Sequence, residues 1–154
     1  MAPKRKIVVG VDGSPQSEAA LRWAIQEAVP ERDEVRAVLV RVRDDLLPGT
    51  SYAVQPHGRR PVGPSPEYAE LLRTTVHRAL QGHQVPPTVT EAVADGDPAT
   101  ELVKEAKDAD LLVVGSHGAR PITEVLLGSA TVHCVRHAHC PVVVITTEAA
   151  QRVH

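Results

Sequence analysis

Five short runs of apolar, mostly β-branched residues recur along the chain and predict β-strands. They span residues 7–11, 35–42, 89–94, 111–114 and 142–145. The first, fourth and fifth runs are apolar nearly throughout, as expected for parallel strands covered on both faces. The second and third runs contain polar residues such as Arg36 and Glu91, so these two strands are expected to lie in more peripheral positions.

Helical patterns fill most of the segments between these runs, and three of them begin with the same signal. A side chain able to cap a helix stands before a proline that fits the first helical position. The three signals are Ser14-Pro15, Ser65-Pro66 and Asp97-Pro98. Apolar residues then recur at helical spacing, and Pro30 is expected to end the first helix. Gly128-Ser129 opens a fourth helix that carries Val132 and Val135.

Strands and helices therefore alternate, which predicts a single α/β domain over residues 1–154. Such alternation gives a parallel sheet with right-handed crossovers and helices on both faces. The simplest arrangement of five strands is the Rossmann-like, doubly wound order 3-2-1-4-5. Residues 44–64 do not fit the pattern because they are rich in Pro and Gly, and we expect a flexible loop there.

In this strand order a crevice opens beyond the carboxyl ends of the first and fourth strands, where doubly wound folds bind ligands. Asp12 follows the first strand, and Gly115 and Gly118 follow the fourth. Gly128 and Ser129 begin the next helix, whose positive dipole end favours an anion. The Ser129 hydroxyl could cap this helix or contact a phosphate oxygen. A plain turn followed by a plain helix cap would fit the spacing equally well, so the glycines alone leave both interpretations open.

Composition narrows the classes of partner. The 154 residues carry a formal net charge of -2 and only three aromatic side chains, Trp23, Tyr52 and Tyr68. Neither a basic field nor a stacking platform for bases is present, so nucleic acid is not expected as a partner. No apolar run reaches the ~18 residues that a membrane span needs. A cytoplasmic protein with reduced cysteines is expected.

A dense group of potential metal ligands lies near the end of the chain. Its members are His133, Cys134, His137, His139 and Cys140. His133 and His137 are four residues apart and share a helix face. An exposed helix flank with a small buried thiol explains the same pattern, and we favour that interpretation over a metal site.

Catalytic signatures are missing from the sequence. No G-x4-G-K-[ST] loop exists to place a lysine on the outer phosphates. The segment 115–118 is not a nucleophile elbow, because its serine stands one position early. We therefore assign no catalytic residue and expect a protein that is not an enzyme, with slow hydrolysis of ATP or autophosphorylation left open.

The spacing Gly115-x2-Gly118-x9-Gly128-Ser129 resembles the nucleotide-binding signature of the universal stress protein family. Three segments resemble that family in the family's order. Residues 7–28 are similar to its first strand, acidic loop and first helix, residues 95–118 to its third helix and fourth strand, and residues 136–145 to its last strand with the preceding helix end.

The resemblance implies binding of ATP with Mg²⁺. Asp12 matches the acidic residue near the adenosine and the metal, and Val42 matches an adenine-contacting position. Gly115, Gly118, Gly128 and Ser129 match the loop that binds ribose and phosphate, and Ala130 and Thr131 continue the helix start around the phosphates. The resemblance also implies a nucleotide-dependent regulatory protein with an unknown protein partner. The alternatives are a binder of AMP or cyclic AMP, a slow ATPase or autokinase, and a nucleotide-free, chaperone-like dimer.

The last strand predicts self-association. In the order 3-2-1-4-5 the segment Val142–Thr146 lies at a sheet edge, and neither a proline nor a charge interrupts it. Soluble proteins seldom leave such an edge open. A homodimer through this strand is therefore expected, and the family resemblance independently implies one. The alternative is that residues 148–154 fold back and cover the edge.

Overall fold

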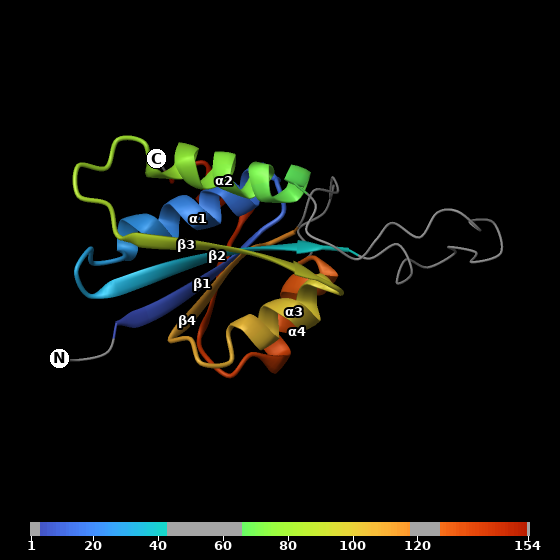
Figure 1. The fold of residues 1–154 in the computed structure, drawn as a ribbon. Helices are drawn as coiled ribbons and strands as arrows, with labels where there is room; N and C mark the ends of the chain where they lie inside the picture. Colours follow the sequence, from blue (N-terminus) through green and yellow to red (C-terminus); the bar gives the residue numbers. More distant parts are fainter. Residues whose placement is uncertain (1–3, 43–65, 118–126, 154) are drawn as a thin grey trace.

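A five-stranded parallel sheet lies between two layers of helices in the computed structural model, which describes residues 4–42, 66–117 and 127–153 (Figure 1). The strands are β1 (Arg5–Val11), β2 (Asp33–Arg41), β3 (Thr88–Asp95), β4 (Leu111–Gly115) and β5 (Val142–Ile145). The helices are α1 (Pro15–Glu27), α2 (Pro66–Leu80), α3 (Pro98–Glu105), α4 (Ser129–His137) and α5 (Thr147–Ala150). The observed order β3-β2-β1-β4-β5 confirms the predicted doubly wound topology.

Two apolar clusters hold the layers on the sheet. Helices α1 and α2 cover one face, and α3 and α4 cover the other (Figure 1). Because side chains alternate along a strand, Ile7 and Val9 of β1 enter the cluster beneath α1 and α2, whereas Val8 enters the cluster beneath α3 and α4. All three are fully buried, which explains why the first run is apolar without alternation.

Charged residues extend β1 and β2 beyond their apolar runs. Arg5 begins β1 and lies opposite Asp33, the first residue of β2. Their side chains form an ion pair at 2.7 Å, in which the Asp33 carboxylate is buried and the Arg5 guanidinium is half exposed. Asp33 also accepts a hydrogen bond of 2.8 Å from the Val29 N–H. The hydrogen bond from Arg5 holds the pKa of Asp33 below its ordinary value, and the Val29 N–H acts in the same direction.

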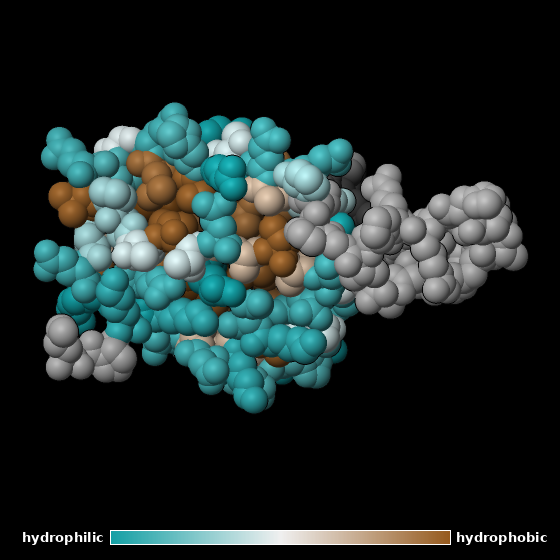
Figure 2. Space-filling model, in the orientation of Figure 1, coloured by the Kyte–Doolittle hydropathy of each residue, from teal (hydrophilic) through white to brown (hydrophobic). Residues whose placement is uncertain are grey.

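Of the two strands expected to be peripheral, only β3 lies at an edge. Strand β2 lies between β1 and β3, and its arginines are ion-paired. Arg36 contacts Glu105 at 2.9 Å, and Arg41 contacts Asp95 at 2.6 Å. Figure 2, which faces the β3 edge, shows apolar surface between α2 and β3.

The helix starts agree with the capping signals within the described residues. Ser14 caps α1 by accepting from the Ser17 N–H, and Asp97 caps α3 by accepting from the Thr100 N–H. Helix α1 ends at Glu27, because the chain is already extended at Ala28 ahead of Pro30. The Ser65 signal and the segment 44–64 fall outside the described residues.

Helix α4 and the tail after β5 differ from the expectation. Helix α4 buries Thr131 and Cys134, whereas Val135, one of the two valines expected on this helix, is 52% exposed. The tail forms α5, and its Ala149 and Val153 pack against the cluster beneath α1. This tail therefore lies on the α1 layer, and among the described strands β5 pairs with β4 alone. None of the described helices is long and apolar enough to cross a membrane.

Candidate functional site

The carboxyl ends of β1 and β4 bring the predicted site residues to one edge of the sheet. The two strands are parallel neighbours with Val9 opposite Val113. Asp12 therefore leaves the sheet beside Ser116, the residue after β4. The start of α4 joins them through Gly128, whose N–H donates to the Ser116 carbonyl at 2.7 Å. Val42 follows β2 at the same edge and is 39% exposed, and Gly118 lies outside the described residues.

Asp12 is held by the start of α1 and stays open to solvent. Its Oδ1 accepts a hydrogen bond of 2.8 Å from the Ser14 N–H, and its own N–H donates to the Ser17 hydroxyl at 3.1 Å. Gly13 makes this turn possible, because its φ of 86° lies in the left-handed region that favours glycine. Oδ2 of Asp12 makes no hydrogen bond within the part of the chain that the structure describes. The carboxylate is thus positioned by the helix start and keeps one oxygen for another partner.

Ser116 connects three elements behind the crevice. Its N–H donates to the Ile145 carbonyl at 2.9 Å, and its carbonyl accepts from Gly128. Its hydroxyl lies 3.1 Å from Nδ1 of His117. Ser116 is buried, so it fixes the distance between the end of β4, the end of β5 and the start of α4. The sequence pattern gives no sign of this role, because a serine between a strand and a glycine is ordinary in a loop.

Gly115 and Gly128 allow backbone segments to approach one another closely. A Cβ at Gly128 would lie 3.2 Å from the His117 Cα, and a Cβ at Gly115 would lie 3.1 Å from the Gln16 Cβ. Both distances are tighter than ordinary carbon contacts. The two glycines therefore have a structural role, which brings the starts of α1 and α4 against the end of β4. That role leaves room for a ligand role, since it draws two helix starts toward one crevice.

The start of α4 presents backbone donors at this edge of the sheet. Gly128 is the capping residue, and no side chain caps the helix. The N–H groups of Ser129, Ala130 and Thr131 belong to the first turn and have no intrahelical carbonyl to bind. The exposed Ser129 hydroxyl does not serve as the cap. Such a helix start is suited to an anion, because its N–H groups and its dipole both favour negative charge.

Thr131 ties the start of α4 to the end of β4. Its buried hydroxyl donates to the Gly115 carbonyl at 2.7 Å. The side chain is therefore used within the protein, and only the Thr131 N–H is left for a ligand. This contact joins the first glycine of the motif to the helix that follows the last one, and it sets where the helix begins relative to β4.

The histidines and cysteines near the end of α4 do not assemble into one metal centre. Among the described residues no group of three or more His, Cys, Asp or Glu side chains could hold a metal ion. Cys134 points into the core, and burial raises its pKa to about 11. Burial also raises the pKa of the Cys140 thiol. The predicted small buried thiol is thus found at Cys134.

Comparison with known proteins shows which family has this sequence and fold. The model of the universal stress protein family matches residues 4–146. The chain belongs to the universal stress protein family. It is 33% identical over 157 residues to universal stress protein Rv2623 of Mycobacterium tuberculosis, covering 96% of this chain and 50% of that protein. It is 32% identical over 148 residues to universal stress protein MJ0531 of Methanocaldococcus jannaschii, covering 92% of this chain and 81% of the relative. The chain spans about half the length of the mycobacterial relatives and most of the archaeal one.

Two solved structures share the fold. A universal stress protein in complex with cAMP aligns with a TM-score of 0.66 at 27% identity, over 95% of this chain and 99% of that chain. Hypothetical protein MJ0577 aligns with a TM-score of 0.69 at 23% identity, over 94% of this chain and 97% of that chain, a likeness that concerns the fold alone. The Rossmann-like class expected from the sequence is therefore confirmed.

Proposed function

We propose that this protein binds ATP, together with Mg²⁺, in the crevice between Asp12 and the start of α4. It acts as a nucleotide-dependent regulatory protein of the stress response, without catalysing a reaction, and is cytoplasmic. Binding of nucleotide sets the surface that it presents to a regulatory protein partner.

One observation carries this proposal. A helix start without a side-chain cap, Ser129–Thr131, lies against the end of β4, and an exposed carboxylate, Asp12, follows the end of the neighbouring strand β1. The first-turn N–H groups suit phosphate oxygens. The free oxygen of Asp12 suits a ribose hydroxyl or a magnesium ion held by the phosphates, since Mg²⁺ prefers oxygen ligands and often binds through a carboxylate together with substrate phosphates. The exposed Val42 at the end of β2 offers apolar surface to a base.

The second candidate ligand is a nucleoside monophosphate, either AMP or cyclic AMP. It is supported by the structural relative that was solved with cAMP at 27% identity. A single phosphate would satisfy the start of α4, whereas a triphosphate would also need room along the crevice. A slow ATPase or autokinase and a nucleotide-free dimer are the remaining alternatives.

Identification of the nucleotide that copurifies with the protein separates these candidates. The protein is denatured after purification without added nucleotide, and the supernatant is analysed by mass spectrometry. We expect ATP. Cyclic AMP or AMP would select the second candidate, ADP would indicate hydrolysis, and no nucleotide together with no binding of ATP in calorimetry would refute the proposal.

The substitution Asp12→Ala tests the site itself, with Asp97→Ala as its matched control. Both aspartates accept a backbone N–H at the start of a helix, Asp12 from Ser14 and Asp97 from Thr100, so each change should cost about 1 kcal/mol of stability. Asp12→Ala alone should also weaken binding of Mg-ATP, by about tenfold or more. Thermal shift with and without Mg-ATP measures both effects. Equal ligand-induced shifts in the two variants would remove Asp12 from the site.

The open edge of β5 supports a homodimer through Val142–Thr146. The Pro141 carbonyl accepts from the Leu112 N–H of β4, and the Ile145 carbonyl accepts from the Ser116 N–H just after β4. Because the direction of backbone groups alternates along a strand, those of Val142 and Val144 point away from β4. A second copy could pair with them about a two-fold axis.

A further inference from the structure

Two histidines on α4 lie side by side, away from the crevice. His133 and His137 are four residues apart on the helix, and the centroids of their rings are 4.3 Å apart, with the ring planes inclined at 41°. His137 is exposed and His133 is partly exposed. Residues with this spacing project from the same helix face. The two imidazoles can therefore reach the same point in solvent.

We propose that His133 and His137 form a binding site for a divalent transition-metal ion such as Zn²⁺, Ni²⁺ or Cu²⁺. Imidazole nitrogen is a preferred ligand of these ions, and hard ions such as Mg²⁺ prefer oxygen. A helix with histidines at i and i+4 presents two such ligands to one ion. The helix holds both side chains on one face before the ion arrives, so little ordering is needed on binding.

The residues around the pair determine how many protein ligands the ion can have. No third His, Cys, Asp or Glu joins the pair among the residues that the structure describes, so water completes the coordination shell. A site with two protein ligands is weaker and exchanges faster than a four-ligand structural zinc site.

The dipole of α4 and the charge of Arg136 affect binding of the ion in opposite directions. His137 lies in the last turn of α4, where the negative end of the helix dipole favours a cation. Arg136 in the same turn opposes binding, but ions in solution screen exposed charges.

The proposed metal site can be tested without nucleotide. Ser129 begins the same helix one turn before His133. The nucleotide contacts proposed there are made by the N–H groups of Ser129–Thr131, and none is made by an imidazole. The buried Cys134 between the histidines points into the core and so contributes no ligand. Metal binding by the pair can therefore be measured on the nucleotide-free protein, whatever the crevice binds.

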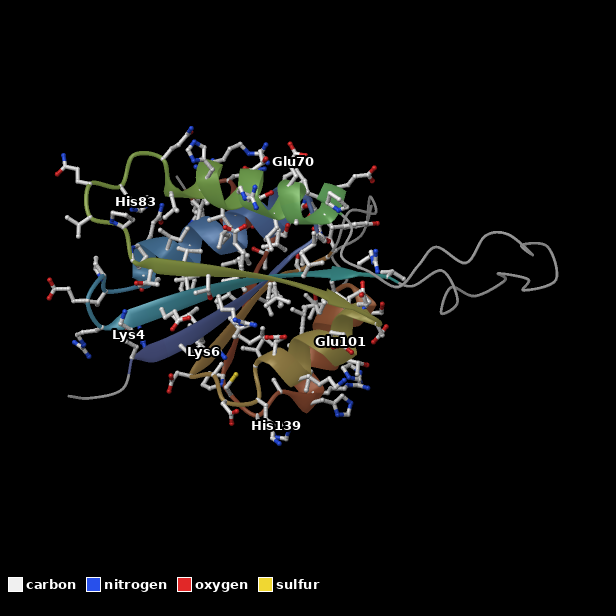
Figure 3. All side chains as sticks on the ribbon, viewed as in Figure 1. Lys4, Lys6, Glu70, His83, Glu101 and His139 are labelled. Carbon is white, nitrogen blue, oxygen red and sulfur yellow. The ribbon has the colours of Figure 1, made fainter. Side chains whose placement is uncertain are left out.

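Calorimetric titration with NiCl2 and with ZnCl2 tests the pair on the full chain without a histidine tag. We expect one ion per chain, with His133→Ala and His137→Ala each weakening the affinity about tenfold or more. His83→Ala and His139→Ala are matched controls, since each removes a histidine that lies outside the pair; Figure 3 shows these two residues on opposite faces of the molecule. Both controls should bind as the wild type does. Melting curves without metal check that every variant is folded.

Three results of the titrations, and a fourth from competition with Mg²⁺, would overturn the proposal. One is a wild-type chain that binds neither Ni²⁺ nor Zn²⁺. Another is a loss of affinity in a control variant as large as the loss in His133→Ala. The third is a loss in Cys140→Ser, which would mean that a thiol holds the ion. Excess Mg²⁺ should not displace the bound ion, and displacement would equally contradict ligation by imidazole.

Discussion

The contact between Thr131 and Gly115 gives the sharpest test of how the site is built. Thr131→Val keeps a β-branched side chain of nearly the same shape and removes only the hydroxyl. That hydroxyl is buried and donates to the Gly115 carbonyl at 2.7 Å. The variant therefore loses the link between the start of α4 and the end of β4, with no large cavity in its place.

The expected cost follows from the burial of the two partners. A buried hydrogen bond contributes about 1 kcal/mol net, and an acceptor left without its donor adds to the loss. Gly115 is only partly buried, so water can reach its carbonyl and the total should be about 1–2 kcal/mol. For a domain of this size each kcal/mol lowers the melting temperature by roughly 2–4 °C.

Urea unfolding followed by the fluorescence of Trp23 measures this cost. Trp23 is the only tryptophan, and it packs against the cluster beneath α1. The urea midpoint should fall in Thr131→Val with an unchanged slope, which identifies a loss of stability without a change in compactness. Thr131→Ser keeps the hydroxyl and should retain most of the stability. If Thr131→Val unfolds at the wild-type midpoint, or if the serine variant is equally weakened, the contact does not hold the helix start.

Two further predictions concern the ion pair at the start of β2 and the open edge of β5. The hydrogen bonds from Arg5 and Val29 lower the pKa of Asp33 in the folded chain, so its ionised form stabilises the fold above about pH 4 and this stabilisation is lost as the pH falls further. Asp33→Asn should therefore lower the free energy of unfolding by roughly 1–3 kcal/mol at pH 7, and urea titrations should show the gap to wild type narrowing at pH 3. For β5, sedimentation at micromolar concentration should find a wild-type dimer and a folded, monomeric Val144→Pro, because the Val144 N–H points away from β4. Val143→Pro should instead destabilise the fold, because the backbone N–H of residue 143 points toward β4, and a monomeric wild type would contradict the dimer.

The alternation of apolar runs and helix signals was sufficient to predict the topology. The run 142–145 coincides with β5, but β1 and β2 each begin two residues before their runs, at Arg5 and Asp33. Hydrophobic patterning could not indicate those residues, because an ion pair places them in the sheet. Helix α5 was missed for a related reason, since its four residues are too few to show a period.

The site was predictable as a location but only partly as a set of contacts. Strand order alone places Asp12 and Gly115 at the ends of neighbouring strands, and the observed strand order agrees. The close approach of Gly115 to Gln16 and the hydroxyl bond of Thr131 depend on loop geometry. No spacing rule relates those residues, so the sequence could not reveal that the motif also fastens two helices to a strand.

The pairing of β1 with both β2 and β4 has a consequence for the order in which the chain folds. Ile7 lies opposite Val35 on one side and opposite Leu111 on the other. During synthesis on the ribosome, β1 to β3 emerge well before β4, so the inner edge of β1 stays unpaired until most of the chain has been made. Exposed strand edges of this kind make partly folded chains prone to misassembly. The proposed nucleotide site draws on residues after β1 and on residues after β4, so a nascent chain could not complete that site until the last third of the chain has joined the sheet.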